Sequence, residues 1–152
     1  MDNPRYLWLA KNGCADGFVL PGLSNTERQQ LNNELSPYKC DVLGFVNTQM
    51  SAENIHTVCK EHGLVYLQLY VGITGTKVTR DEFEGVLAIA KEYPNTSVFA
   101  GFGIDTKERA EQLLGKGFDG VIIGTAFIKK QNESIIELTR YIKHIKSGPV
   151  WE

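Results

Sequence analysis

The sequence predicts an α/β fold made of about five parallel strand–helix units, and two observations support this prediction. Short apolar runs alternate with stretches of helical spacing, and the runs occupy residues 17–20, 41–46, 64–70, 97–100 and 120–123. Each run is almost wholly apolar, which is typical of parallel strands that are buried on both faces. Because single helices separate the strands, we expect right-handed crossovers and a parallel sheet.

The composition indicates one soluble globular domain over residues 1–152. Apolar residues make up 42 % of the 152-residue chain and charged residues 22 %. The net charge of −2 provides no basic surface, so we expect neither nucleic acid nor a membrane as a partner. No run approaches the roughly 20 apolar residues of a membrane span, and the first residues do not resemble a signal peptide.

The three cysteines predict a cytoplasmic protein without a metal centre. Cys14, Cys40 and Cys59 lie far apart and form no CxxC pair, which argues against a zinc site and against a disulfide framework. Free thiols of this kind fit a reducing cytoplasm. We therefore expect no metal ion and no cofactor.

Four predicted helices follow a residue or residue pair that can cap their first turn. In a capping box, the first side chain and a glutamate three residues later satisfy free helix amides reciprocally. The expected caps are Ser24 with Glu27 before a helix to about residue 35, Ser51 before 52–61, Thr79 with Glu82 before a helix to about 92, and Asp105 with Glu108 before 107–114. A last helix is expected at about 134–146.

An internal repeat supports a fold built from similar units. Residues 13–22 and 117–124 both read glycine, Asp-Gly, three apolar residues and a further glycine. Repetition of one supersecondary unit is expected for a barrel or a stacked array. An open doubly wound sheet is equally compatible with the repeat.

Glycine follows three successive predicted strands, and this pattern predicts an anion site. The segments are Gly72 to Gly75 after the third run, Gly101 to Gly103 after the fourth, and Gly124 with Thr125 after the fifth. Ligands of parallel α/β folds bind at these carboxyl ends of strands. Glycine lets a backbone amide approach an anion closely, and amides at a helix N-terminus carry partial positive charge. Tight turns would explain any one of these glycines, but three on neighbouring strands favour a phosphate cradle.

No acid–base group is expected at this end of the sheet, so we predict no catalytic residue. The aspartates that precede strands belong to the opposite face, and they are Asp16, Asp41 and Asp119. Helix capping explains Glu27, Glu82, Asp105 and Glu108, while His56, His62 and His144 fall within helices or at a helix end. General acid–base chemistry needs such a group to face the pocket.

These motifs together resemble the C-terminal half of the tryptophan synthase alpha subunit family. Residues 64–75 resemble the sixth strand and its loop, residues 100–104 (AGFGI) the end of the seventh strand, and residues 119–129 the eighth. Residues 17–24 resemble the fourth strand, although the family commonly has aspartate at Gly22 and proline at Ser24. Asn3-Pro4 resembles the end of the third strand. The likeness covers nearly the whole chain, and the family more often has serine at Thr125.

The resemblance implies a partial (β/α)8 TIM barrel whose units are equivalent to strands 4–8. The family cleaves indole-3-glycerol phosphate in tryptophan biosynthesis. By resemblance, the amides of Gly75, Gly103, Gly124 and Thr125 hold the phosphate, and Tyr66, Thr74 and Phe102 line the substrate pocket. The acid–base glutamate and aspartate of the family come from the second and third strand ends. Those units have no counterpart in this sequence, so we do not expect the lyase activity from the chain alone.

Five strands cannot close a barrel that requires eight, so open strand edges are expected. Open apolar edges favour pairing with another chain, and we therefore expect a homodimer or higher oligomer. A separate polypeptide that supplies the missing strands and a flattened open sheet are the alternatives. A tryptophan synthase beta-type subunit is a further partner that the resemblance implies. The function is then a phosphorylated-ligand protein of the alpha type, a non-catalytic phosphate-binding or assembly protein, or a structural relic.

Overall fold

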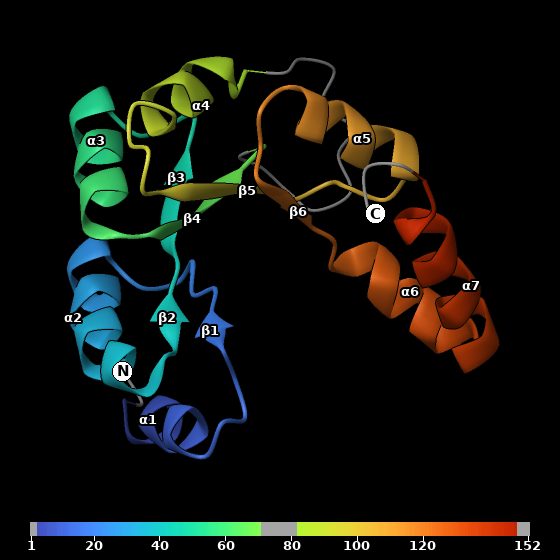
Figure 1. The fold of residues 1–152 in the computed structure, drawn as a ribbon, viewed down its shortest axis with the longest axis horizontal. Coiled ribbons are helices and arrows are strands. Elements are labelled where there is room, and N and C mark those ends of the chain that lie inside the picture. Colours follow the sequence, from blue (N-terminus) through green and yellow to red (C-terminus); the bar gives the residue numbers. More distant parts are fainter. Residues whose placement is uncertain (1–2, 71–81, 149–152) are drawn as a thin grey trace.

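The computed structural model of the chain describes residues 3–70 and 82–148, which form an arc of strands with helices along its outer side (Figure 1). The helices are α1 (Asn3–Lys11), α2 (Asn25–Leu35), a 3-10 turn η1 (Ser36–Tyr38), α3 (Ala52–Glu61), α4 (Glu84–Ala90), α5 (Lys107–Gly115), α6 (Thr125–Glu133) and α7 (Ile135–Lys146). The strands are β1 (Gly17–Phe18), β2 (Asp41–Val42), β3 (Gly44–Asn47), β4 (Leu64–Gln68), β5 (Ser97–Gly101) and β6 (Gly120–Ile122).

All strand pairs in the described residues are parallel and follow the order of the chain. One sheet pairs β1 with β2, and the other has the order β3-β4-β5-β6. A doubly wound sheet reverses its strand order at a switch point, whereas a barrel adds each strand on the same side. The observed order therefore favours the barrel arrangement over the doubly wound sheet.

The predicted strand at residues 41–46 is interrupted once, at Leu43. β2 before this residue pairs with β1, and β3 after it pairs with β4. The Leu43 amide donates a hydrogen bond of 3.0 Å to the Phe18 carbonyl, so the link with β1 extends to the interruption. This run of sequence thus connects the two sheets (Figure 1).

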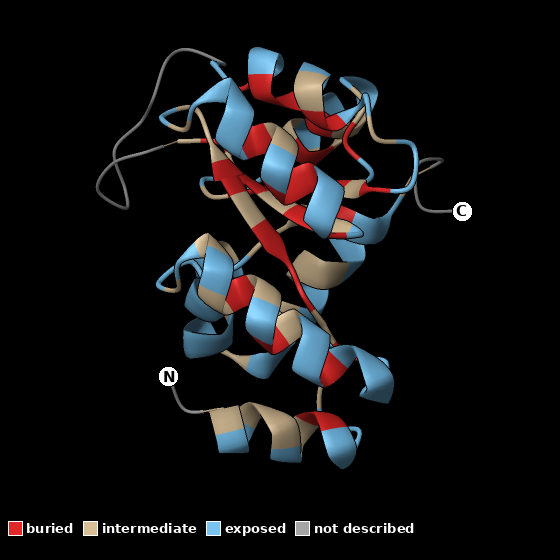
Figure 2. Cartoon of the chain, turned by 90° about the vertical axis from the view of Figure 1, so that its left-hand side faces the viewer, coloured by how far each residue is buried: buried red, intermediate tan, exposed pale blue. Residues whose placement is uncertain are grey.

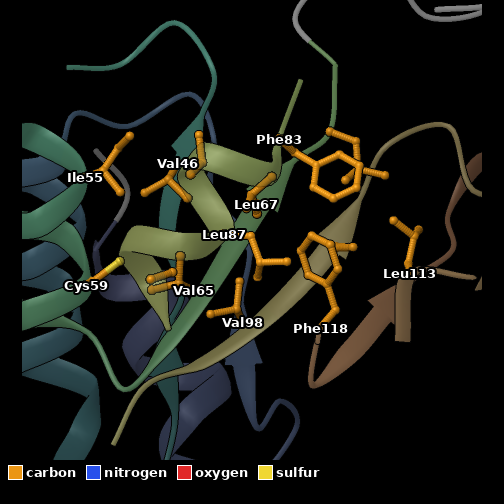
Figure 3. Packing of buried hydrophobic residues seen from close by; sticks show 14 of the residues in the cluster. Val46, Ile55, Cys59, Val65, Leu67, Phe83, Leu87, Val98, Leu113 and Phe118 are labelled. Carbon is orange, nitrogen blue, oxygen red and sulfur yellow. The ribbon is translucent and has the colours of Figure 1, made fainter. Parts of the chain in front are cut away.

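The larger core lies between the outer helices and one face of the four-stranded sheet. Buried and half-buried residues alternate along β3 and β4 and over most of β5 (Figure 2). Buried strand residues pack in one cluster with residues of α3, α4 and α5. Figure 3 shows Val46, Val65, Leu67 and Val98 from the strands packed against Ile55, Cys59 and Leu87 from α3 and α4. A second cluster joins α1, α2 and β2 through Ala10, Leu31, Leu35, Cys40 and Val42.

The other face of the sheet has no described helix packed along it, although Arg28 of α2 places its guanidinium carbon 5.4 Å from the centroid of the Phe45 ring. Phe45, Tyr66 and Phe99 are in register across β3, β4 and β5 and belong to neither core cluster. All three are only half-buried, in contrast to their strand neighbours on the helix side. The expectation of strands buried on both faces is therefore met on one face only, and the inner face of the arc stays open.

Two helices were not predicted from the sequence. Asn3 and Pro4 begin α1, so they are not the end of a strand. Thr125 begins α6, which directly follows the last strand. Its sequence, TAFIKKQNE, has few apolar residues, and Gly124 before it offers no capping side chain, so the usual start signal is missing.

Capping was predicted correctly at two helices and incorrectly at one. Ser24 and Glu27 form the expected capping box, and Ser51 accepts a backbone hydrogen bond at the start of α3 as expected. Ser134 caps α7 in the same way, which was not predicted. Thr106 caps α5, where Asp105 with Glu108 was expected, because the extended Thr106 backbone lets its hydroxyl reach the Arg109 amide at 3.2 Å. Thr79 lies outside the described residues, and α4 begins at Glu84 without a side-chain cap.

The second cluster makes a stability prediction at Leu31. This side chain is fully buried, so Leu31→Ala leaves a cavity and is expected to lower the free energy of unfolding by about 2–5 kcal/mol. Chemical denaturation measures the change. The neighbouring exposed residue provides the control, because Gln30→Ala on the same helix should change the free energy by less than about 0.5 kcal/mol. Equal effects of the two substitutions would contradict the packing described for α2.

Candidate functional site

Glycines were predicted just beyond three strands, and we call these positions the glycine tips. Strand pairing brings two of the three to the same edge of the sheet. Gly101 of β5 is in register with Ile122 of β6, and Gly103 and Gly124 each lie two residues beyond this pair. Adjacent strands are about 4.8 Å apart, so the two tips are neighbours at the carboxyl end of the sheet. The third predicted tip, Gly75, and the pocket residue Thr74 lie outside the described residues.

The N-terminus of α6 presents backbone amides without a side-chain cap. Gly124 is its N-cap residue, makes no side-chain hydrogen bond, and is followed by the exposed Thr125 at the first helical position. Ser or Thr side chains cap α2, α3, α5 and α7 in contrast. The first turn of α6 also has no acidic residue. Free amides and the positive end of the helix dipole make this terminus suited to an anion.

The loop between β5 and α5 has an unusual backbone at the two predicted site residues. Phe102 has a φ of 78° and Gly103 a φ of 76°, so two successive residues lie in the left-handed region. A bulky side chain rarely adopts this conformation, and such strain is frequent at binding sites. Glycine is required at position 103 for a second reason, since a Cβ there would lie 2.9 Å from the Tyr70 ring.

Two tyrosines from distant parts of the sequence hold this loop in place. The Tyr70 hydroxyl, at the end of β4, accepts a hydrogen bond of 3.0 Å from the Arg109 guanidinium of α5. The Tyr141 hydroxyl of α7 donates a hydrogen bond of 2.8 Å to the Asp105 carbonyl. Ile104, which lies between Gly103 and Asp105, is buried. Burial, with a smaller effect of the Asp105 charge, raises the pKa of Tyr141, which therefore stays a neutral donor. The sequence analysis did not single out these tyrosines.

Tyr66 lies on the inner face of the sheet, below the glycine tips. Its ring stacks on Phe45 with centroids 5.6 Å apart and planes 9° apart. The ring and hydroxyl also cover Gly101, since a Cβ on that glycine would collide with them. Burial raises the pKa of the Tyr66 phenol, so it stays protonated at neutral pH. Tyr66 lies on β4 and Phe102 directly follows β5, and these two strands are neighbours in the sheet.

The aspartate before β6 lies on the opposite face, as expected. Asp119 accepts a 2.7 Å hydrogen bond from the Val98 amide and forms a 3.1 Å ion pair with Lys91. Glu27 is bound by Ser24, whose backbone and side-chain hydrogen bonds lower the pKa of that carboxyl. Asp105 was predicted to cap α5, but Thr106 is the cap. Asp105 is instead an exposed residue two positions after Gly103.

The three histidines lie on helices or at a helix end, as expected. His56 of α3 pairs with the Tyr93 hydroxyl at 2.7 Å, and His144 is in the last turn of α7. His62 is buried with its Nδ1 3.0 Å from the Val42 carbonyl, and burial lowers its pKa. Within residues 3–70 and 82–148, no three His, Cys, Asp or Glu side chains gather as metal ligands would.

Neither disulfides nor membrane-spanning helices are found in the described part of the chain. Cys14 is exposed, whereas Cys40 and Cys59 are buried, and all three are free thiols. Burial raises the pKa of Cys59 to about 11. No described helix has both the length and the apolar character needed to cross a bilayer.

Comparison with known proteins identifies relatives of this chain. A family model described as tryptophan synthase alpha chain matches residues 2–147. The tryptophan synthase alpha chain of Arabidopsis thaliana is 29 % identical over 154 residues, which cover 96 % of this chain and 56 % of that protein. That of Lacticaseibacillus casei is 32 % identical over 146 residues, which cover 88 % of this chain and 53 % of the other. The chain thus spans about half the length of these relatives.

A solved structure shares the fold. A chain of the tryptophan synthase α2β2 complex of Pyrococcus furiosus superposes with a TM-score of 0.76 at 23 % identity, covering 95 % of this chain and 59 % of that chain. The likeness and the strand order together confirm the predicted partial (β/α)8 barrel.

The geometry of the β5–α5 loop makes a prediction at Gly103. Gly103→Ala places a Cβ against the Tyr70 ring and forces alanine into the left-handed region, so we expect a loss of about 1–3 kcal/mol in unfolding free energy. Thermal or urea denaturation measures it. Gly85→Ala is the control, because Gly85 lies within α4 with open space around it, and alanine should stabilise that helix by about 0.5–1 kcal/mol. A neutral or stabilising Gly103→Ala would show that the loop differs from the description.

Proposed function

The chain belongs to the tryptophan synthase alpha chain family, and from this premise we propose that it binds a phosphorylated small molecule of the indole-3-glycerol phosphate type. In this proposal the backbone amides of Gly103, Gly124 and Thr125 hold the phosphate, and Gly75 completes the cradle. Tyr66, Thr74 and Phe102 line the pocket for the rest of the ligand.

One observation carries the proposal. The uncapped N-terminus of α6 lies beside the Phe102-Gly103 loop on the adjoining strand, so free amides of two elements occur at one edge of the sheet. A phosphate dianion at a helix N-terminus is stabilised by direct hydrogen bonds and by the helix dipole. The two tyrosine hydrogen bonds that hold the loop fix it before a ligand arrives, which reduces the entropy lost on binding.

We do not assign the lyase activity of the family to this chain alone. The resemblance places the acid–base glutamate and aspartate on the second and third strand ends, which the five units found here do not include. Each acid–base group contributes roughly 10²–10⁴-fold to a rate, so turnover at these five units would depend on the strands that supply the two groups. A polypeptide that supplies those units could restore the activity.

A second candidate function is assembly, and the open edges of the sheet favour it. β1 pairs only with β2 and β6 only with β5, so each leaves one edge unpaired among the described strands. Large exposed apolar side chains accompany both edges, namely Trp8, Val19 and Tyr38 on one side and Phe127, Ile128, Ile135 and Ile136 on the other. We propose that a homodimer or higher oligomer covers these edges and the inner face. The α2β2 complex of the Pyrococcus relative makes a beta-type subunit a further candidate partner.

The phosphate proposal predicts a ligand-dependent rise in melting temperature. Inorganic phosphate and indole-3-glycerol phosphate should each stabilise the wild-type chain, because a ligand that binds only the folded state shifts the unfolding equilibrium. Gly124→Val should abolish this shift, since its side chain enters space that is empty around Gly124 and blocks the amides. Gly22→Val is the matched control, because Gly22 also follows a strand and has open space around it. Phosphate-independent melting of the wild type would contradict the proposal.

The assembly proposal predicts a dimer or larger species in solution. Light scattering of the 152-residue chain at micromolar concentration should give at least twice the monomer mass of 17.0 kDa. Ile128→Lys should weaken assembly without unfolding the chain, because 57 % of that side chain is exposed. Asn33→Lys, on the exposed surface of α2, should leave the mass unchanged. A well-folded monomer of the wild type at this concentration would refute the proposal.

A further inference from the structure

A layer of polar groups lies on the inner face of the sheet, between the aromatic side chains and the glycine tips. Asn47 of β3, Gln68 of β4 and Gly101 of β5 are in register, two residues beyond Phe45, Tyr66 and Phe99. Side chains two residues apart on a strand point to the same face, so Asn47 and Gln68 share the open face with the aromatic side chains.

The side-chain amides of Asn47 and Gln68 fulfil only part of each other's hydrogen-bonding capacity. The Asn47 Nδ2 group donates to Gln68 Oε1 over 3.4 Å, which is long for a hydrogen bond. Asn47 Oδ1 is engaged, since it accepts a 3.0 Å hydrogen bond from the Gln49 amide, and this fixes the orientation of the Asn47 side chain. Within the described residues, the Gln68 Nε2 group and the second Nδ2 hydrogen of Asn47 have no protein acceptor.

The Tyr66 hydroxyl belongs to the same layer. The backbone of Tyr66 is two residues before Gln68 on β4. The Tyr66 side chain reaches forward, so its hydroxyl lies over Gly101, the residue in register with Gln68. No hydrogen bond joins this hydroxyl to another described residue. Three polar side chains from two adjacent strands thus place hydrogen-bonding groups at one level of the sheet, and each has a group without a partner among the described residues.

The hydrogen-bonding capacity of these groups matters once a ligand covers them. Asn47, Gln68 and Tyr66 are half-buried on the open face, and amides and a hydroxyl that lose contact with water need new partners. Their position also matters, because the layer lies two residues, or roughly 7 Å, below Gly103 along the strand. A ligand whose phosphate is at the glycine tips would therefore pass its first few carbon atoms over Asn47 and Gln68.

We propose that Asn47, Gln68 and the Tyr66 hydroxyl bind hydroxyl groups on the carbon chain of a polyol phosphate and so determine which phosphate ester the site accepts. The inference rests on the proposed phosphate site and adds the residues that select its ligand. The free N–H groups of the two carboxamides can donate to alcohol oxygens, and the Tyr66 hydroxyl can donate or accept. The neutral layer also places no negative charge beside the ligand phosphate.

The test compares two phosphate esters that differ only in their hydroxyl groups. Glycerol 3-phosphate and n-propyl phosphate have similar size and the same charge, and their dissociation constants can be measured by calorimetry on the full chain. The wild type should bind glycerol 3-phosphate roughly three- to tenfold more tightly, as expected for one or two net hydrogen bonds. Gln68→Leu should remove this preference and leave the affinity for n-propyl phosphate and inorganic phosphate unchanged. Tyr66→Phe should reduce the preference in the same way.

Controls separate the inference from the proposed function on which it rests. Gln30→Leu, an equivalent change at an exposed position of α2, should keep the wild-type preference. A wild type that binds both esters equally, or a Gln68→Leu variant that keeps the preference, would overturn the polyol layer while the phosphate site stands. If none of the three phosphate compounds binds the wild type, the phosphate site itself is wrong. Melting curves establish that each variant is folded before binding is measured.

Discussion

The in-register parallel pairing of β5 with β6 is the constraint on which the candidate site depends. This register places Gly101 opposite Ile122 and so brings the Phe102-Gly103 loop beside the start of α6. A side chain at the far end of the pair reinforces it, because Asp119 accepts a hydrogen bond from the Val98 amide at 2.7 Å. A slip of one residue would turn the β6 side chains to the other face and separate Gly124 from Gly103. The DGxxxG motif therefore has a structural part at Asp119 and a candidate binding part at Gly124.

The open inner face links ligand binding to assembly. Helices α3, α4 and α5 cover one face of the sheet, and the described chain leaves the other to Phe45, Tyr66 and Phe99. Residues on that face would contact two different molecules. A ligand would occupy the part near the carboxyl ends of the strands, and a partner chain would cover the aromatic part. Any partner that closes the arc would also enclose the ligand and strengthen its polar contacts by excluding water.

Local sequence signals predicted the parts of the fold that local chemistry determines. The capping box of Ser24 and Glu27 and the Ser51 cap depend on residues three positions apart, so both were predictable from the sequence. Helix α6 was missed because Gly124 gives it no capping side chain. The exchange of Asp105 for Thr106 was missed because the two residues are adjacent and either side chain can cap a helix. Their backbone angles decide between them, and these depend on the loop as a whole.

Contacts between distant residues account for what the sequence could not show at the site. Tyr70 meets Arg109 across 39 positions, and Tyr141 meets the Asp105 carbonyl across 36. Asn47 becomes a neighbour of Gln68 only through the register of β3 with β4. No periodicity or spacing rule predicts such pairs. The positions of Gly103 and Gly124 just beyond β5 and β6 were predictable, because an apolar run precedes each of them and marks the strand.

The central claim is that amides of Gly103, Gly124 and Thr125 bind one phosphate group together, and an NMR titration tests it most directly. Amide proton and nitrogen shifts of the ¹⁵N-labelled chain are followed as inorganic phosphate is added at constant pH and ionic strength. If these residues share one anion, all three amide signals move with a single dissociation constant, and amides on the opposite face, such as that of Asp119, stay in place. Signals that do not move, or that move with different dissociation constants, would contradict a common phosphate site.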